Sequence, residues 1–152
     1  MSKMPRNQFR AGLESGVPQF GAWLGIPDPT AAEIMAGAGF DWLLVDHEHG
    51  AFELCDVLAH LRALAAYDVA PLVRPVSGDP ALLKKLCDIG AQSFVVPMID
   101  TAEQAAQVVS AVKYPPEGIR GMGTSLARAA RWNSISGYAG KANDEMCVVV
   151  QA

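Results

Sequence analysis

Four short apolar segments recur along this chain, and their spacing is the feature that most restricts its fold. The segments begin near residues 20, 42, 70 and 93, and a stretch with apolar residues at helical spacing follows each of them. A strand and a helix repeated four times predict parallel strands joined by crossover helices. We therefore expect an α/β fold built on one parallel sheet.

Capping patterns support the expected helices between these strands. A helix start is marked by a small polar residue that is followed by proline, or by glutamate or glutamine three residues later. The expected starts are Thr30 with Glu33, Asp79 before Pro80, and Thr101 with Gln104. Residues 1–18 are expected to form an arm or a first helix ahead of the first strand.

The regular alternation ends after residue 113. Residues 114–140 are rich in glycine and basic side chains and contain only short helical patches, which predicts an irregular region. A fifth apolar run follows at 146–150. The 152 residues suffice for a single domain, whereas a complete eight-stranded barrel takes about 250 residues. The pattern therefore fits either the first part of such a barrel or a small open sheet.

Composition places the chain among globular proteins and limits its partners. The hydrophobic fraction is 51%, and a formal net charge of −4 argues against a general nucleic-acid binder. No apolar run approaches the ~20 residues of a membrane span, and the first residues lack the apolar centre of a signal peptide. Cys55, Cys87 and Cys147 are odd in number and far apart, so we expect buried free thiols. These features predict a soluble cytoplasmic protein.

Residues 42–49 carry the densest group of chemically active side chains. Four apolar residues are followed directly by Asp46, His47, Glu48 and His49. The apolar run predicts a strand buried on both faces, and the sites of α/β folds lie at the carboxyl ends of strands. Two carboxylates and two imidazoles at such an end suit proton transfer or metal binding. The alternative is a well-hydrogen-bonded turn, which we rank second.

Arg74 stands near the end of the third expected strand, directly before Pro75. An unpaired guanidinium in an apolar strand is costly, so an acidic partner such as Glu48 is required. Lys84 and Lys85 lie on an expected helix rather than late on a strand. This position argues against a Schiff-base mechanism, which needs a desolvated amine.

Several short motifs occur in the order and spacing of one known family. The segment Asp46–His49 resembles the Asp-x-Glu-His strand end of the HpcH/HpaI aldolases. The other matching segments are Leu72–Val76, Cys87–Gln92, Val96–Ala105, Tyr114–Pro116, Arg120–Gly121 and Ala127–Trp132. The chain is thus similar to class II, metal-dependent pyruvate aldolases on a (β/α)8 TIM barrel. The resemblance implies that residues 1–152 form one domain that supplies about the first five strands.

The resemblance implies a role for five residues. His49 corresponds to the active-site base, and Asp88 to the acid that pairs with it. Asp46 corresponds to an aspartate at the same strand end, close to that histidine. Arg74 corresponds to the arginine that stabilises the enolate oxygen and contacts the substrate, and Gln151 to a substrate-binding glutamine. Without the resemblance, Asp88 would be read as a surface aspartate, and Gln151 would attract no attention.

The implied reaction is reversible aldol cleavage of a 2-keto-4-hydroxy acid to pyruvate and an aldehyde. Cleavage removes a proton from the 4-hydroxyl group, and the reverse reaction removes one from the pyruvate methyl group. Histidine titrates near neutrality and suits both directions. Both directions also place negative charge on an enolate oxygen, which an arginine and a metal ion would stabilise.

The resemblance also implies a cofactor and an oligomer. The family binds its divalent metal with a glutamate two residues after the glutamine that Gln151 matches, and with a later aspartate. Both positions lie after Ala152, so no metal ligand is expected within these residues. Mg²⁺ or Mn²⁺ is the expected ion, with Co²⁺ as a further option. Family members form homo-oligomers, and we expect one here.

Residues 114–140 are expected to lie near the barrel mouth. This irregular region carries Arg120, Arg128 and Arg131. Near the mouth, these arginines would meet an acidic substrate. The alternative for them is a solvated helix face.

Three other functions stay open at this point. One is a related barrel lyase that acts on citryl or malyl thioesters, although no coenzyme A cradle is visible. A second is a metal hydrolase with His47 and His49 as zinc ligands, for which only His60 remains to complete the site. The third is a catalytically inactive half-barrel that assembles with another chain through its exposed fifth strand.

Overall fold

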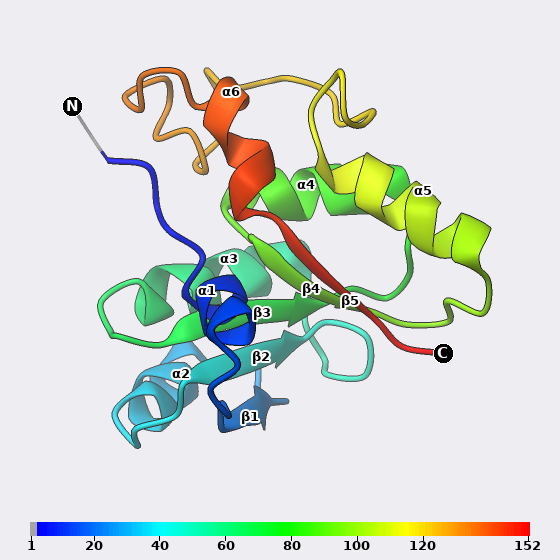
Figure 1. The fold of residues 1–152 in the computed structure, drawn as a ribbon. Helices are drawn as coiled ribbons and strands as arrows, with labels where there is room; N and C mark the ends of the chain where they lie inside the picture. Colours follow the sequence, from blue (N-terminus) through cyan, green and yellow to red (C-terminus); the bar gives the residue numbers. More distant parts are fainter. Residues whose placement is uncertain (1–2) are drawn as a thin grey trace.

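The computed structural model describes residues 3–152 and contains one sheet of five parallel strands (Figure 1). The strands are β1 (Gly21–Leu24), β2 (Trp42–Asp46), β3 (Ala70–Arg74), β4 (Ser93–Val96) and β5 (Cys147–Val150). They pair in chain order, from β1 to β5. A doubly wound sheet would reverse its order at one point, whereas barrel strands follow one another without a break. The predicted α/β fold, with the first five strands of a (β/α)8 barrel, is confirmed.

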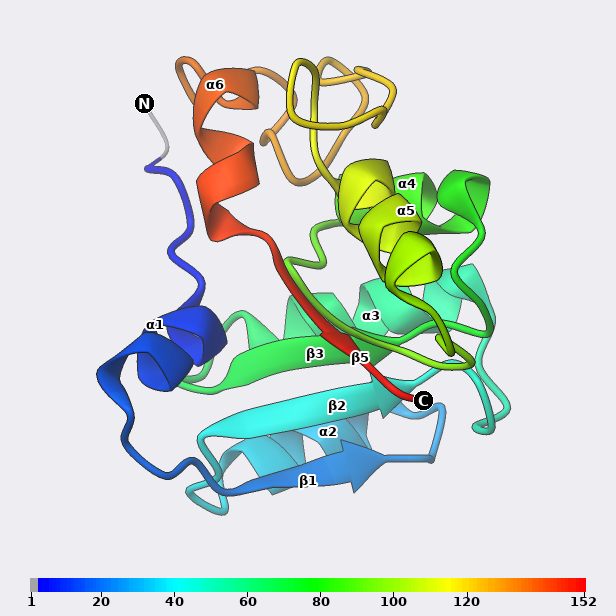
Figure 2. The ribbon, with the colours of Figure 1, turned by 45° about the vertical axis from the view of Figure 1, so that its right-hand side comes forward.

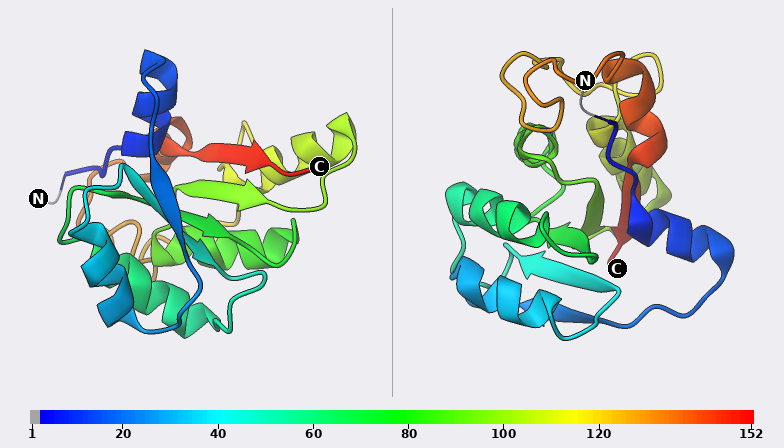
Figure 3. Two further views of the ribbon diagram at one scale, coloured as in Figure 1. Left: turned by 90° about the horizontal axis from the view of Figure 1, so that it is seen from below. Right: turned by 90° about the vertical axis from the view of Figure 1, so that its left-hand side faces the viewer.

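Four helices cover the outer face of this sheet (Figure 3). They are α2 (Pro29–Ala36), α3 (Leu54–Leu64), α4 (Pro80–Ile89) and α5 (Ala102–Val112). Alternate strand residues such as Leu43, Val73 and Phe94 are fully buried against them in the main core. The helices follow their strands, and their apolar stripes pack on the sheet as the helical spacing predicted.

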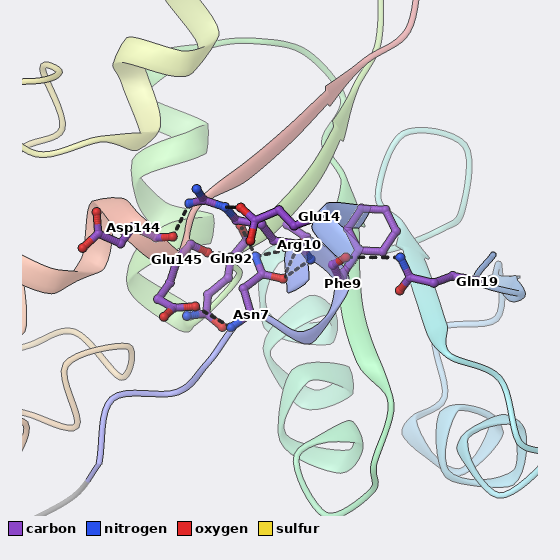
Figure 4. A network of polar contacts seen from close by, with 9 residues as sticks. Asn7, Phe9, Arg10, Glu14, Gln19, Gln92, Asp144 and Glu145 are labelled. Atoms are coloured by element: carbon purple, nitrogen blue, oxygen red, sulfur yellow. Dashed lines mark hydrogen bonds and ion pairs between the residues drawn. The ribbon is translucent and has the colours of Figure 1, made fainter. Parts of the chain in front are cut away.

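The inner face of the sheet has its own small core at the amino ends of the strands. Helix α1 (Gln8–Ser15) places Phe9 against Leu44 and Leu72 on this face (Figure 2). Asn7 caps α1 and reaches β4, because its Nδ2 donates to Ser93 Oγ at 2.9 Å (Figure 4). The expectation of a first helix within residues 1–18 is therefore confirmed for the part that the structure describes; residues 1–2 lie outside it.

The helix starts match the capping patterns with one exception. The N-caps at Asp79 and Thr101 are confirmed. The Thr30–Glu33 capping box is wrong, because α2 begins at Pro29 and Asp28 is its N-cap. The Asp28 carboxylate accepts a hydrogen bond from the Thr30 backbone N–H at 2.8 Å. The dipeptide Asp28-Pro29 thus repeats the order that marks the start of α4.

Residues 114–140 are irregular, as expected, and they lead into α6 (Ala139–Ala142) and a short 3-10 helix (Asn143–Glu145) before β5. Their position differs from the expectation. Arg128 donates to the carbonyl oxygens of Leu61 and Ile89 at 3.2 and 2.9 Å, which lie in the last turns of α3 and α4. These helix ends attract guanidinium groups through their free carbonyls. The region therefore lies at the amino ends of the strands, opposite to the barrel mouth.

The three cysteines are free, but only one is buried. Cys87 is buried, Cys147 is partly buried and Cys55 is exposed, so the expectation of three buried thiols is wrong for Cys55. Helix α3 presents Cys55 on its outer side because the apolar stripe of that helix runs through Val57, Leu61 and Leu64.

No helix within residues 3–152 has the length and apolar character needed to cross a membrane.

Candidate active site

The register of the sheet brings Asp46, Arg74 and Gln151 to one end of its inner face. Asp46 and Arg74 are partners in the pairing of β2 with β3. Gln151 directly follows β5, and its backbone N–H donates to Val96 O at 2.9 Å. Side chains alternate between faces along a strand, so all three point inward. The end of the chain accordingly lies beside the tips of β2 and β3 (Figure 2).

Asp46 and Arg74 form a two-pronged ion pair at this end. Arg74 Nε donates to Asp46 Oδ1 at 2.9 Å, and Nη2 donates to Oδ2 at 2.7 Å. Both residues are 8% exposed. Burial opposes ionisation of Asp46, but the hydrogen bonds from Arg74 and from two backbone N–H groups outweigh it, so the pKa of Asp46 is lowered. The hydrogen bonds to Asp46 raise the pKa of Arg74, so the pair stays charged at neutral pH.

Asp46 also shapes the loop that carries the predicted base. Its Oδ1 accepts the backbone N–H groups of Glu48 and His49, each at 3.2 Å. Its carbonyl oxygen accepts the Gly50 N–H at 3.0 Å. One side chain therefore fixes both the orientation of Arg74 and the turn that leads to His49.

Glu48 stands between Arg74 and His49. Its Oε2 is 3.1 Å from Arg74 Nε, and its Oε1 is 3.6 Å from His49 Nε2. The His49 side chain is 72% exposed, so its ring stands at the open side of this cluster. The structure thus brings Asp46, Arg74, Gln151 and His49 into one neighbourhood, with Glu48 as the link. Glu48 is the acidic partner of Arg74 that the sequence required, in addition to Asp46.

Trp23 is a candidate site residue that the sequence did not reveal. Its ring lies under the Arg74 guanidinium, 4.4 Å from the ring centroid to the Cζ atom. Its position on β1 opposite Leu44 places it on the same inner face. The signal was the alternation of Gly21, Trp23 and Gly25, which isolates one large aromatic on that face. A cation held over an aromatic ring gains about 0.5–2 kcal/mol, which adds to the restraint on Arg74.

Asp88 lies elsewhere. It stands in the last turn of α4, at the amino ends of the strands, and accepts a hydrogen bond from Arg120 Nη2 at 2.8 Å. Arg120 in turn stacks over the Tyr114 ring at 4.3 Å. Within this chain Asp88 makes no contact with His49, so the pair that the resemblance implied is not formed by these residues alone.

The other two histidines do not join His49 in a zinc site. His60 is fully buried in α3 and faces the carbonyl oxygens of Asp56 and Ile26. His47 has a buried Nδ1 atom without a hydrogen-bond partner. Within residues 3–152, no three histidine, cysteine, aspartate or glutamate side chains gather as metal ligands. The zinc hydrolase alternative is therefore not supported.

The carboxylates at the site face Arg74 and His49, although Glu48 Oε2 is buried without a hydrogen-bond partner. Both oxygens of Asp46 accept from Arg74, and both oxygens of Glu48 lie beside cationic or imidazole nitrogens. Because three such ligand side chains do not come together within residues 3–152, these residues alone do not form a donor set for a divalent ion.

Parallel strands in chain order, with charged side chains at their carboxyl ends, are typical of (β/α)8-barrel enzymes. The profile of the HpcH/HpaI aldolase/citrate lyase family matches residues 19–152. The chain belongs to this family.

Curated relatives agree with this assignment. A hydroxypyruvate/pyruvate aldolase of Deinococcus radiodurans is 57% identical over 145 residues, which is 95% of this chain and 52% of that protein. A 4-hydroxy-2-oxo-heptane-1,7-dioate aldolase of Escherichia coli is 52% identical and covers 95% of this chain and 55% of that protein. The chain thus spans about half the length of the curated relatives it matches.

A solved structure shows the same architecture. The crystal structure of an HpcH/HpaI aldolase/citrate lyase family protein from Burkholderia cenocepacia matches with a TM-score of 0.89 and 34% identity. The match covers 95% of this chain and 58% of that one. The two structures therefore share the same fold over almost the whole of this chain.

Proposed function

We propose that the protein to which these residues belong catalyses reversible aldol cleavage of a 2-keto-4-hydroxy acid to pyruvate and an aldehyde. The observation that carries the proposal is the Asp46–Arg74 ion pair beside His49 at the carboxyl ends of β2 and β3. It places a fixed positive charge next to a group that can accept a proton. The names of the relatives as aldolases support the same reaction class.

Arg74 is proposed to hold the developing enolate oxygen. Its Nε and Nη2 atoms are occupied by Asp46, whereas Nη1 meets only Gln151 Oε1, at a long 3.5 Å. Nη1 is therefore the donor that a substrate oxygen can recruit. A donor held in place before the reaction stabilises charge without reorganisation, and one such donor is worth about 10²–10³ in rate.

His49 is proposed to act as the base. In cleavage it takes the proton of the 4-hydroxyl group, the bond between C3 and C4 breaks, and the electron pair moves to the C2 keto oxygen. The aldehyde leaves, and protonation of C3 then gives pyruvate. Glu48 Oε1, 3.6 Å from His49 Nε2, stabilises the protonated ring. The role of Asp88 as the partner of His49 stays a prediction, because its contacts in this chain are with Arg120.

Gln151 is proposed to contact the substrate beside Arg74. The expected divalent ion, Mg²⁺ or Mn²⁺ with Co²⁺ as an option, stays a prediction from the resemblance. The charge balance of the site supports a bound cation. The two carboxylates of Asp46 and Glu48 exceed the single positive charge of Arg74, so without a further cation they would repel an anionic keto acid. The expected homo-oligomer also stays a prediction.

The test uses the full-length protein with Mg²⁺ or Mn²⁺ and a series of 2-keto-4-hydroxy acids. Pyruvate release is followed by its reduction with lactate dehydrogenase and NADH. We expect cleavage by the wild type, a loss of about 10²–10⁴-fold in His49→Gln, and near wild-type rates in His47→Gln, the adjacent histidine control. Absence of cleavage with every acid and both metals would refute the proposal, and so would an active His49→Gln variant.

A further inference from the structure

His60 makes contacts that an ordinary core residue of a helix would not make. It lies in α3 with none of its surface exposed. Its Nδ1 is 2.9 Å from Asp56 O in the same helix, and its Nε2 is 3.2 Å from Ile26 O, 34 positions earlier in the chain. Both carbonyl oxygens can only accept hydrogen bonds. A ring with one N–H group therefore binds the carbonyl that this group faces, and a ring with two N–H groups binds both carbonyls.

The carbonyl oxygen of Ile26 belongs to the loop that joins β1 to α2. This loop begins directly after Leu24, one residue beyond the Trp23 ring that lies under Arg74. The Ile26 side chain is 64% exposed and contributes nothing to the core that would hold the loop. The hydrogen bond to His60 therefore ties this exposed turn to the rigid helix behind it.

His60 also supports the loop that carries His49. Its ring meets the edge of Phe52, with centroids 4.9 Å apart and an interplanar angle of 72°. The Phe52 backbone N–H donates to Gly50 O at 2.8 Å. A Cβ atom at Gly50 would come within 2.6 Å of the Phe52 ring, so this ring lies directly against the residue that follows His49.

We propose that His60 is a positioning residue of the active site. It fastens the β1–α2 loop through Ile26 and the β2–α3 loop through Phe52 to α3, and so fixes Trp23 and His49 relative to Arg74. The inference rests on the proposed function, because that function gives His49 and Arg74 their roles. Its physical basis is that two loops leading from two adjacent site strands converge on one buried imidazole. Rates fall steeply when a catalytic group shifts by about 1 Å, so fixing the loops affects turnover.

The experiment compares His60→Phe, which keeps a ring but removes both ring nitrogens, with His60→Gln, which keeps a donor. Asn143→Leu is the control. Asn143 is also buried and bonds two backbone groups of Tyr114, but it lies at the opposite end of the strands. All variants are made in the full-length protein. Amide hydrogen exchange is measured by mass spectrometry, together with kcat and KM for cleavage.

In His60→Phe we expect exchange at least about 10-fold faster in peptides that cover 25–28 and 47–53, as lost hydrogen bonds imply. Peptides of α4 and α5 should change by less than about 2-fold. We expect kcat to fall about 10-fold with a smaller change in KM. His60→Gln should restore part of both effects. Asn143→Leu should lower the melting temperature without changing kcat.

Uniform loosening of the whole chain in His60→Phe would overturn the proposal, because it would assign His60 to the core alone. Unchanged exchange in both loops would overturn it as well, as would kcat values in His60→Phe and His60→Gln equal to that of the control. The exchange measurement needs no activity. If the wild type cleaves no keto acid, the reaction assignment fails while the anchoring of the two loops is still decided.

Discussion

Within residues 3–152, two aspartate–arginine pairs lie at opposite ends of the same sheet. Asp46 and Arg74 lie at the carboxyl ends of the strands, and Asp88 and Arg120 at the amino ends. Both arginines also lie over an aromatic ring, Trp23 and Tyr114, at nearly the same distance. The chemical parts of the two pairs are therefore the same.

Their surroundings differ. Arg74 meets two carboxylates and an amide, and its Nη1 atom makes only the long contact of 3.5 Å with Gln151 Oε1. The Arg120 side chain has no exposed surface, and its Nε and Nη1 atoms are buried without a hydrogen-bond partner. A free N–H group is useful only where a substrate can reach it. We therefore propose that the first pair serves the reaction and that Arg120 holds residues 114–140 to the sheet.

The largest expected difference is between the same substitution at the two arginines. Arg74→Lys keeps the charge but loses the planar fork that Asp46 holds, so kcat/KM for cleavage should fall about 100-fold. Arg120→Lys should leave kcat/KM within about 3-fold and lower the melting temperature, because an ammonium ion is more strongly hydrated than a guanidinium. Steady-state kinetics and calorimetry on the full-length variants provide the comparison. Equal losses of activity in both variants would contradict the proposal that only Arg74 takes part in the reaction.

The amino-end pair should respond to stability measurements. Asp88→Ala leaves the buried Arg120 charge unpaired and should lower the free energy of unfolding by about 2–3 kcal/mol, since Asp88 itself is partly solvated. Arg120→Met removes the charge and should cost about 1 kcal/mol or less. Urea unfolding gives both values. A larger cost for Arg120→Met than for Asp88→Ala would contradict this account of the pair.

Asp46→Asn should affect both activity and pH dependence. The substitution loosens Arg74 and the turn to His49, so we expect kcat to fall about 10-fold. The folded-state pKa of Asp46 is lowered, so its ionised form stabilises the fold at pH values above the ordinary aspartate pKa of about 3.9. This contribution is lost as the pH falls through the lower folded value. Melting temperatures below pH 4 should therefore fall more steeply in the wild type than in Asp46→Asn; parallel curves would contradict the assignment.

Thiol labelling provides the smallest test. Burial raises the pKa of Cys87, which adjoins Asp88, to about 12, whereas Cys55 is exposed. At pH 8 a thiol reagent should modify Cys55 and leave Cys87 unmodified in the native wild type. In Asp88→Ala, labelling of Cys87 should become detectable as the amino-end region opens. Rapid labelling of Cys87 in the native wild type would show that this region is not sealed.

The repeat of apolar segments was enough to predict the sheet and its outer helices, because buried positions in strands and helices recur in the sequence as apolar residues at regular spacing. The neighbourhood of Asp46, Arg74 and His49 could also be predicted, since Asp46 to His49 are contiguous and Arg74 ends an apolar strand. Trp23 was missed because its partner Arg74 lies on β3, and the two meet only through the registers of β1 with β2 and of β2 with β3.

The amino-end region could not be placed from sequence. Whether Arg120 and Arg128 face a substrate, a carboxylate or helix carbonyls depends on how an irregular segment folds back. Residues 114–140 show no regular spacing of apolar residues from which the course of this segment could be predicted. Asp88 shows the same limit, because one motif suggested a partner for it and the fold supplied another within this chain.

The most direct test of the central claim is deuterium exchange into the methyl group of pyruvate, followed by proton NMR in D₂O with the full-length protein and Mg²⁺ or Mn²⁺. Exchange requires a base and a stabilised enolate but no aldehyde. The account predicts exchange by the wild type and by Arg120→Lys, and losses of about 100-fold or more in His49→Gln and Arg74→Lys. Exchange at the wild-type rate in His49→Gln would contradict the claim that proton transfer takes place at the carboxyl ends of β2 and β3.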